Sequence, residues 1–407
     1  MPTPLRLSLA RSLTAIVCAL LLGTSGCRRS GFPDVPDGYR EYAYVSNGGS
    51  NTVTVLDLVY LRQDRTLQVG ANPTNLAVNP VRNEIYVVNT QSGTISVIDA
   101  ETNRIVATIP VHHLPSFVSV DPTGHRAYVA NSGANTISVI DLDHRGQIAV
   151  AGTGELPGVV RISPDGRSLV VANRGSNSVS VFDVPPYNPA AGSEPPPRLR
   201  AAFPGCPGAS DTVILPDSSK AFIACSAGHQ VMAVSLAAAP GSWAAKQNSA
   251  LMTDHMLTLL DVGTMPVHLA MKPDGGEIFV SNYGSDSISE ISTGTTEVGG
   301  TYTIGSKPVL GIVSRDNSML WVANFGADSL AMYSIDDGRL IGNVRTGSAP
   351  DALAFSEDEH LLLAADAHSG DVAVIRTAGG PLPALFTILP AGVSPNAIAV
   401  KAIQKTP

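Results

Sequence analysis

The stretch "AYVANSGANTISVIDL", residues 127–142, predicts two short β-strands around a tight turn. Its Tyr, Val, Ile and Thr residues favour strands, and the Asn-Ser-Gly-Ala-Asn run between them is typical of a turn. Seven further copies, some close and some weak, begin at Ala43, Ile85, Leu169, Ala221, Ile278, Leu320 and Leu362. A segment that occurs eight times indicates a repeat protein.

The copies begin 42, 42, 42, 52, 57, 42 and 42 residues apart. Each unit also carries a second motif, Pro-x-x followed by an apolar run, as in "PGVVRISPDG" from Pro157. Short strands with a period of this length predict the blade of a β-propeller. From the centre outward, we name the strands a (Pro-x-x-apolar), b (Tyr-Val-Ala-Asn type), c (Ile-Ser-Val-Ile-Asp type) and d.

The two ends of the array predict a closed ring. It begins with a strand b, "EYAYVSN" (41–47), and ends with a strand a, "PNAIAVK" (395–401). The last strand can therefore complete the first blade and leave no open sheet edge. The predicted fold is an all-β closed propeller of eight four-stranded blades over residues 41–402, followed by a tail, 403–407. Seven blades with a divergent extra sheet are the alternative.

Two insertions explain the spacings of 52 and 57. Residues 185–198 are rich in proline and are predicted to be extended, and residues 237–256 are expected to hold a short helical turn. Both fall between strands c and d of consecutive blades. They are either decoration or, through exposed Tyr187 and Trp243, a contact with a partner.

The composition opposes nucleic acid as a partner. The formal charge is −8, and removing residues 1–26 takes away Arg6 and Arg11 but no acid, so a mature chain would stand at −8 − 2 = −10. Binding to phosphates needs a basic surface. We expect a monomer that binds no nucleic acid.

The N-terminal sequence resembles a bacterial lipoprotein signal. A basic start is followed by an apolar run of about a dozen residues, too short for a stable anchor, and by small residues before Cys27. Thr24 stands where such signals usually have Leu. The resemblance implies cleavage after residue 26, a lipid on Cys27 and a tether over 27–40.

Such a chain would be exported and lipid-anchored in the cell envelope, at the periplasmic face of an outer membrane or at the cell surface. An ordinary secretory signal is the alternative. After cleavage two cysteines other than Cys27 remain, and a pair in an oxidising compartment predicts a Cys206–Cys225 disulfide. Extrapolated hairpin pairing places Cys225 opposite Ser210, and the loop that carries Cys206 is expected to hold two extra residues. Two separate buried thiols are the alternative.

"YVAN" with "NTISVID" and "PDG" at 42-residue spacing resembles the YVTN-type β-propeller repeat family over residues 41–402. Propellers of that family commonly have seven blades, whereas eight are counted here. Two copies lack the Asn that ends strand b, where Cys225 and Asp366 stand instead. Related propellers include lactonases and the haem-binding or quinoprotein subunits of periplasmic oxidoreductases, and the fold does not choose among them.

Candidate ligand-binding residues are those that break the repeat. The b–c turns and d–a loops should share one face, which we call the top face. The position after the strand-b Asn holds small residues in five copies, but Arg174, Tyr283 and Phe325 in the other three. Two aromatic rings and a guanidinium suit a planar or anionic group.

His112 and His113, in a d–a loop, and His268, at the start of a strand a, are further candidates. Adjacent imidazoles can reach one ion, but the sequence has no H-x-x-x-H, Cys-x-x-Cys-His or EF-hand spacing. We therefore predict neither a metal nor a cofactor. Serines of the b–c turns and aspartates that end strand c recur in many blades, which indicates turn geometry, so no catalytic residue is predicted.

The favoured interpretation is a non-enzymatic binding scaffold of the cell envelope whose ligand, a protein or a small molecule, is unknown. One alternative is a cofactor- or metal-carrying component of a periplasmic oxidoreductase. Another is a lactonase-like hydrolase.

Overall fold

The structure is a computed structural model of the 407-residue chain. It describes residues 36–187, 195–239, 242, 246, 248–378 and 382–403. The predicted signal peptide, Cys27, Trp243 and most of the C-terminal tail lie outside the described residues. Residues 37–407 belong to one compact unit.

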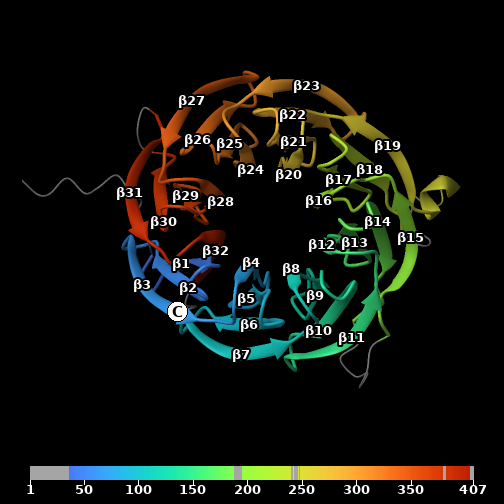
Figure 1. The fold of residues 1–407 in the computed structure, drawn as a ribbon, viewed down its shortest axis with the longest axis horizontal. Helices are drawn as coiled ribbons and strands as arrows, with labels where there is room; N and C mark the ends of the chain where they lie inside the picture. Colours follow the sequence, from blue (N-terminus) through green and yellow to red (C-terminus); the bar gives the residue numbers. More distant parts are fainter. Residues whose placement is uncertain are drawn as a thin grey trace, which may run out of the picture. The chain divides into compact units, whose positions relative to one another are not determined.

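Eight four-stranded antiparallel sheets are arranged in a ring, as predicted (Figure 1). The inner strands a are β4 (Pro73–Val78), β8 (Pro115–Val120), β12 (Pro157–Ile162), β16 (Ala209–Ile214), β20 (Pro266–Met271), β24 (Pro308–Val313), β28 (Pro350–Phe355) and β32 (Pro395–Ile403). The strands b are β1 (Arg40–Asn47), β5 (Glu84–Asn89), β9 (Arg126–Asn131), β13 (Ser168–Asn173), β17 (Lys220–Cys225), β21 (Glu277–Asn282), β25 (Met319–Asn324) and β29 (Leu361–Asp366).

The outer half of each sheet consists of strands c and d. The strands c are β2 (Thr52–Asp57), β6 (Thr94–Asp99), β10 (Thr136–Asp141), β14 (Ser178–Asp183), β18 (Gln230–Ser235), β22 (Ser287–Ser292), β26 (Ser329–Ser334) and β30 (Asp371–Arg376). The strands d are β3 (Arg62–Gln68), β7 (Arg104–Pro110), β11 (Gly146–Gly152), β15 (Arg198–Pro204), β19 (His255–Asp261), β23 (Glu297–Thr303), β27 (Arg339–Arg345) and β31 (Ala384–Pro390).

The ring is closed by the two ends of the propeller. Strand β32 pairs antiparallel with β1, from Arg40 opposite Ile403 to Asn47 opposite Pro395, and completes the sheet β3-β2-β1-β32. The closed eight-bladed fold is therefore confirmed, and the seven-bladed alternative is excluded. Because the chain enters and leaves this sheet at the same end, Arg40 and Ile403 lie on the face opposite the b–c turns, which we call the bottom face.

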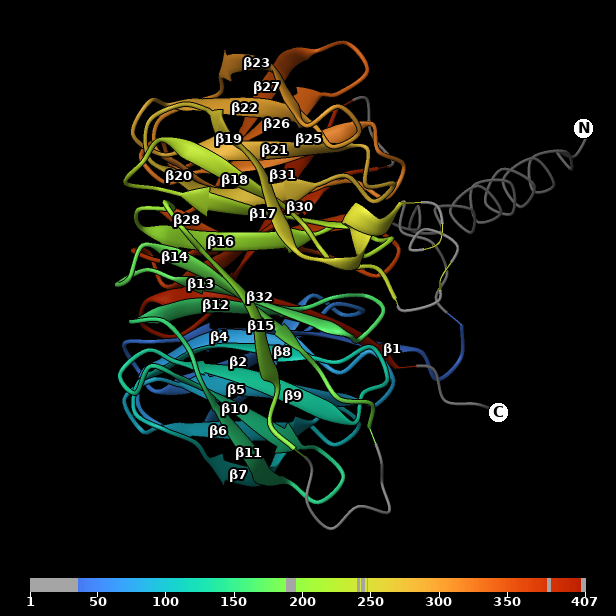
Figure 2. The same ribbon diagram turned by 90° about the vertical axis from the view of Figure 1, so that its right-hand side faces the viewer.

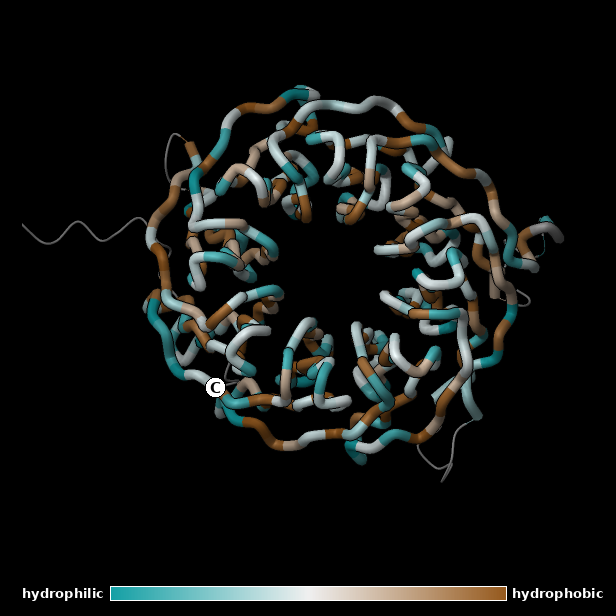
Figure 3. Tube along the Cα trace, viewed as in Figure 1, coloured by the Kyte–Doolittle hydropathy of each residue, from teal (hydrophilic) through white to brown (hydrophobic). Residues whose placement is uncertain are grey.

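Burial decreases from the middle strands to the edge strands. Strand b is buried along its length in most blades, because neighbouring blades cover both of its faces, whereas strand d alternates between exposed and covered residues. One cluster joins Val88 and Val97 of one blade to Val118 and Val129 of the next. Figure 3 shows apolar and polar residues in turn along the outer ring. Stacking of blades thus supplies the core that a single repeat lacks.

The b–c turns need a left-handed backbone at their last residue. The eight residues at this position all have φ between +51° and +73°, and they are Asn51, Gly93, Asn135, Asn177, His229, Asp286, Asp328 and Gly370. Asn, Asp and Gly tolerate this conformation best. The Asn51 Oδ1 also accepts a hydrogen bond from the Asn72 N–H, at 2.8 Å, which ties the turn to the next d–a loop.

The aspartates that end strand c cap the c–d connections. Asp57 Oδ1 accepts hydrogen bonds from the N–H groups of Val59 and Tyr60, at 3.0 and 3.1 Å. Asp99 and Asp141 accept the equivalent pair. These contacts support their interpretation as turn residues.

Both insertions connect strands c and d of consecutive blades, between β14 and β15 and between β18 and β19 (Figure 2). The second holds the short 3₁₀ helix η1 (Ser249–Met252). Tyr187 is half-buried, because its ring stacks on His125 at 4.8 Å and its hydroxyl donates to Asp143. The expected exposure of Tyr187 is wrong, since it packs on its own propeller. Among the described residues, no helix is long and apolar enough to cross a membrane.

Candidate binding site on the top face and in the central channel

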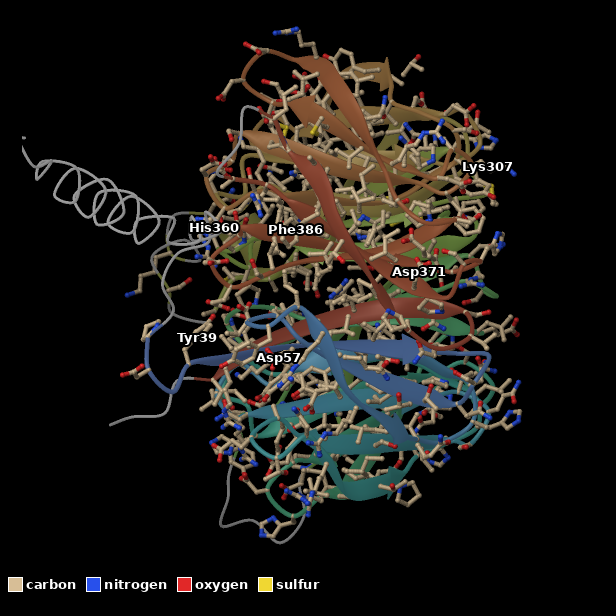
Figure 4. The ribbon with its side chains drawn as sticks, turned by 90° about the vertical axis from the view of Figure 1, so that its left-hand side faces the viewer. Tyr39, Asp57, Lys307, His360, Asp371 and Phe386 are labelled. Atoms are coloured by element: carbon tan, nitrogen blue, oxygen red, sulfur yellow. A yellow bond between two sulfur atoms is a disulfide. The ribbon has the colours of Figure 1, made fainter. Side chains whose placement is uncertain are left out.

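The b–c turns and d–a loops lie together, as predicted. In each blade the residue after strand b donates its backbone N–H to the carbonyl of the residue before strand a. Examples are Arg174 to Leu156, Tyr283 to Met265 and Phe325 to Lys307, at 3.0 to 3.1 Å. In Figure 4, Lys307 and Asp371 lie toward this top face, whereas Tyr39 and His360 lie toward the bottom face.

Beneath the top face, the strand-b Asn forms a recurring polar node. The Asn47 amide donates to the hydroxyls of Thr52 and Thr54 on strand c, at 3.0 Å each. The same two bonds are made by Asn89, Asn131, Asn173 and Asn282. All of these amides are buried, and because they recur they belong to the scaffold.

A close approach of the d–a loop completes this node. In five blades a glycine precedes the strand-b position by 19 residues, and in the closing blade Gly392 takes the equivalent place beside Asn47. A Cβ built on Gly70 would lie only 2.7 Å from that of Asn89. Cys206 and Cys225 occupy this pair of positions in their blade, where they form a disulfide with Cα atoms 4.8 Å apart. Close packing of two backbones at this node brings the sulfur atoms within bonding distance.

Two details of the sequence argument for the disulfide were wrong. Cys225 lies opposite Ala209 and not Ser210, because a β-bulge interrupts the pairing of β16 with β17. The loop 205–208 also has no extra residues, since it is as long as the equivalent loop 69–72.

Two of the three aromatic or basic side chains that break the repeat belong to one surface. Lys307 Nζ lies 5.8 Å from the centre of the Tyr283 ring, and the Phe325 ring packs edge-on against His368 at 5.3 Å. The Lys307 carbonyl also accepts the Phe325 N–H. These four side chains span three successive blades, and we call them the top-face arc.

Arg174 does not join this arc. It is exposed two blades away, and its Nη2 would lie 3.6 Å from a Cβ built on Gly158. The end of the arc at His368 borders a groove of about 580 Å³, where the blade β28–β31 meets the closing blade. Small residues and loop backbone form most of its walls, and the lining residues are Ser50, Ala367, His368, Ser369, Gly370, Ala391, Gly392, Val393 and Ser394.

His112 and His113 point to different neighbours. His112 Nε2 lies 3.5 Å from the amide nitrogen of Gln147 on β11, whereas the His113 ring lies over Gly133. His229 is structural, because its Nδ1 accepts the N–H of Met265 as Asn51 does in its own blade. Within the part of the chain that the structure describes, no three His, Cys, Asp or Glu residues are grouped to hold a metal ion.

His268 belongs to a second group of side chains, on the wall of the central channel. Phe117, Arg161, Asp211 and His268 come from the consecutive inner strands β8, β12, β16 and β20. Asp211 lies between Arg161 Nη2 and His268 Nε2, 3.7 Å from each. The Arg161 guanidinium lies 4.7 Å from the centre of the Phe117 ring. We call these four residues the channel cluster.

The hydrogen bonds of the cluster hold Asp211 and His268 in place. Asp211 accepts the N–H groups of Thr212 and Leu269, at 2.8 and 3.0 Å. His268 Nδ1 accepts the Gly311 N–H at 3.3 Å, so the proton of a neutral ring resides on Nε2. Burial lowers the pKa of His268, Asp211 opposes that shift and Arg161 reinforces it. A neutral imidazole whose Nδ1 already accepts a hydrogen bond has no free lone pair with which to act as a general base.

Sequence reasoning identified His268 but missed Phe117, Arg161 and Asp211. All four stand two or four residues after the start of strand a, where most other blades have small or aliphatic residues. The departure from the repeat at these positions was the available signal.

The comparisons with known proteins support the fold. A family model described as "Lactonase, 7-bladed beta-propeller" matches residues 43–156 and 312–381, less than half of the chain. No curated protein matches this chain. Among solved structures, the dihydro-heme d1 dehydrogenase NirN in complex with DHE is 15% identical, with a TM-score of 0.71 over 91% of this chain and 76% of that one.

Two further structures are similar at the level of the fold. Apo AztD from Citrobacter koseri is 14% identical, with a TM-score of 0.63 over 91% of this chain and all (100%) of that one. Kuenenia stuttgartiensis hydrazine synthase is 22% identical, with a TM-score of 0.53 over 82% of this chain and 92% of that one. These proteins have different names and are at most 22% identical to this chain, so the likeness shows the fold alone.

Proposed function

We propose that this protein is a binding scaffold of the cell envelope that takes its ligand on the top face, at the top-face arc. The observation that carries the proposal is the continuity of Tyr283, Lys307, Phe325 and His368 over three blades. The position just after strand b, which holds Tyr283 and Phe325 in two blades, holds a small residue or Arg174 in the others. Two rings beside an ammonium group suit a planar ligand that bears negative charge.

The position of the chain ends supports the same proposal. The propeller begins at Arg40 on the bottom face, where Glu41 Oε1 accepts the N–H of Glu357 from an a–b turn. A tether that leads to a lipid on Cys27 would therefore leave from the bottom face. The top face would then point away from the membrane, free to meet a ligand or a protein.

The lipid anchor is tested by fractionation. We expect intact mass spectrometry of membrane fractions to show an acylated chain that begins at Cys27, and Cys27→Ala to release the protein. A Cys27→Ala protein that stays in the membrane would contradict the anchor without affecting the binding proposal.

The binding proposal is tested by a thermal-shift screen of planar anionic compounds with the wild type and a Tyr283→Ala, Phe325→Ala double variant. We expect a hit whose stabilisation of the wild type is lost in the double variant. Arg339→Ala, at an exposed residue of outer strand β27, is the matched control and should keep the full shift. A hit that stabilises the double variant as well as the wild type would refute the arc as the site.

The second candidate is an oxidoreductase component that carries a cofactor, and the position of His268 in the channel wall is the observation that favours it. The colour of the purified protein and its metal content distinguish this candidate from a plain scaffold.

A further inference from the structure

We infer that the channel cluster is a second binding site, separate from the top-face arc, and that it takes the carboxylate of a small organic anion at Arg161. The inference starts from the hydrogen bonds of Arg161. Its Nε donates to the Thr212 carbonyl at 3.2 Å, and no other hydrogen bond of this side chain is present among the described residues. A guanidinium has five N–H donors, so most of them remain for a ligand.

Asp211 orients this arginine without satisfying it. Its carboxylate oxygens already accept two backbone N–H groups, and the 3.7 Å separation from Arg161 Nη2 is too long for a hydrogen bond. The Phe117 ring covers the guanidinium at 4.7 Å and limits its movement. Arg161 is thus held in place while its terminal nitrogens stay available, which favours bidentate binding of a planar carboxylate.

Exposure and the chemistry of the neighbouring wall agree with this assignment. The Arg161 side chain is 40% exposed and that of His268 is 24% exposed, so solvent in the channel reaches both. The apolar side chain beside Arg161 is Phe117 on β8, whose ring lies 4.7 Å from the guanidinium. An aromatic ring beside a cationic group suits an anion with an apolar body.

The test is a ligand-observed NMR titration with sodium benzoate as the probe and benzamide as its neutral isostere. We expect benzoate to saturate the wild type in the millimolar range and benzamide to bind at least about tenfold more weakly, because only benzoate carries the charge. Arg161→Gln should raise the Kd for benzoate about tenfold or more. Arg161→Lys, which keeps the charge without the planar fork, should raise it less.

Arg62→Gln, at an exposed arginine of outer strand β3, is the matched control and should bind benzoate as the wild type does. Inorganic phosphate as a competitor separates a carboxylate site from a general anion site, and stronger displacement by phosphate than by acetate would contradict the carboxylate preference. Equal binding of benzoate and benzamide, or unchanged binding to Arg161→Gln, would overturn the inference. Loss of benzoate binding in Tyr283→Ala, Phe325→Ala but not in Arg161→Gln would move the anion to the top-face arc.

Discussion

The blades β16–β19 and β28–β31 depart from the same structural node in opposite ways. In the first, Cys206 and Cys225 replace the Gly–Asn pair with a covalent bond. In the second, Asp366 replaces the Asn and faces Asp371, where six other blades place Thr or Ser and the disulfide blade places Gln230. Asp366 Oδ2 accepts the Gly347 N–H at 3.0 Å, whereas its buried Oδ1 has no hydrogen-bond partner.

The difference shows that one node can be stabilised by oxidation in one blade and by protonation in another. An amide donates to its strand-c partners at any pH, but a carboxylate beside a second carboxylate must carry a proton to do so. Burial, and after it the proximity of Asp371, raises the pKa of Asp366 to about 7, although the Gly347 N–H opposes the shift.

The largest loss of stability is expected from opening the ring. This experiment tests whether the two nodes keep their blades folded when β32 no longer closes the propeller. Deletion of residues 395–403 removes strand β32 and leaves the edge of β1 unpaired. Because each blade is stabilised by its neighbours, we expect a loss of about 5 kcal/mol or more and a broadened thermal transition. Calorimetry checks this, and an unchanged cooperative transition would show that β32 is dispensable.

The next effect concerns the oxidised node. Cys206→Ala with Cys225→Ala should lower the free energy of unfolding by about 3 kcal/mol, because the bridge closes a loop of about 20 residues in the unfolded chain. Urea denaturation measures this, and a reductant should reproduce it in the wild type. The variant Cys206→Gly with Cys225→Asn introduces the Gly–Asn pair found in other blades. It should recover part of the free energy of unfolding that the double-alanine variant loses. A double-alanine variant as stable as the wild type would contradict a structural role for the disulfide.

A smaller, pH-dependent effect is expected at the acidic node. The pKa of Asp366 is near 7 in the folded chain and near 3.8 when unfolded, so the folded state binds more protons between these values. Stability from this group is therefore complete below about pH 4 and is lost as the pH rises through 7. We expect the wild-type Tm to fall over this range and the Tm of Asp366→Asn to fall less. The corresponding change in the free energy of unfolding should be smaller in the variant by about 1–2 kcal/mol.

The Tm of both proteins between pH 4.5 and 8.5 is the measurement. Other buried acids titrate in both proteins, among them Asp351, whose pKa burial raises, so only the difference between the two curves reports on Asp366. Equal slopes would show that the pair shares no proton in the folded chain.

The smallest effect on stability is expected at the top-face arc. Tyr283→Ala with Phe325→Ala removes one cation–π and one edge-on ring contact, which together contribute about 1 kcal/mol. Chemical denaturation should show this small change, in contrast to the losses at the two nodes. A loss as large as that of the disulfide variant would mean that the arc is part of the scaffold and not a surface kept for a ligand.

The class of fold, the number of blades, the closure by the last strand and the positions of both insertions could be predicted from the sequence. These features depend on local patterns, namely the 42-residue period, short β-branched segments and turn residues such as Asn51 that adopt a positive φ. The spacing of 19 residues from Gly70 to Asn89 is also that from Cys206 to Cys225, so the repeat already contained the geometric reason for the disulfide.

The side chains that meet across blades could not be predicted from the sequence, because their contacts depend on how the blades pack. Phe117, Arg161, Asp211 and His268 are each one blade further along the chain, and they come together because the inner strands lie side by side around the channel. Most residues of the inner strands are partly exposed, so they follow neither the apolar pattern of a core nor the polar pattern of a surface. The partner of Cys225 was also predicted wrongly by one residue, because a β-bulge shifts the pairing of β16 with β17. A bulge depends on how two strands pair, and the residues of one strand alone do not specify it.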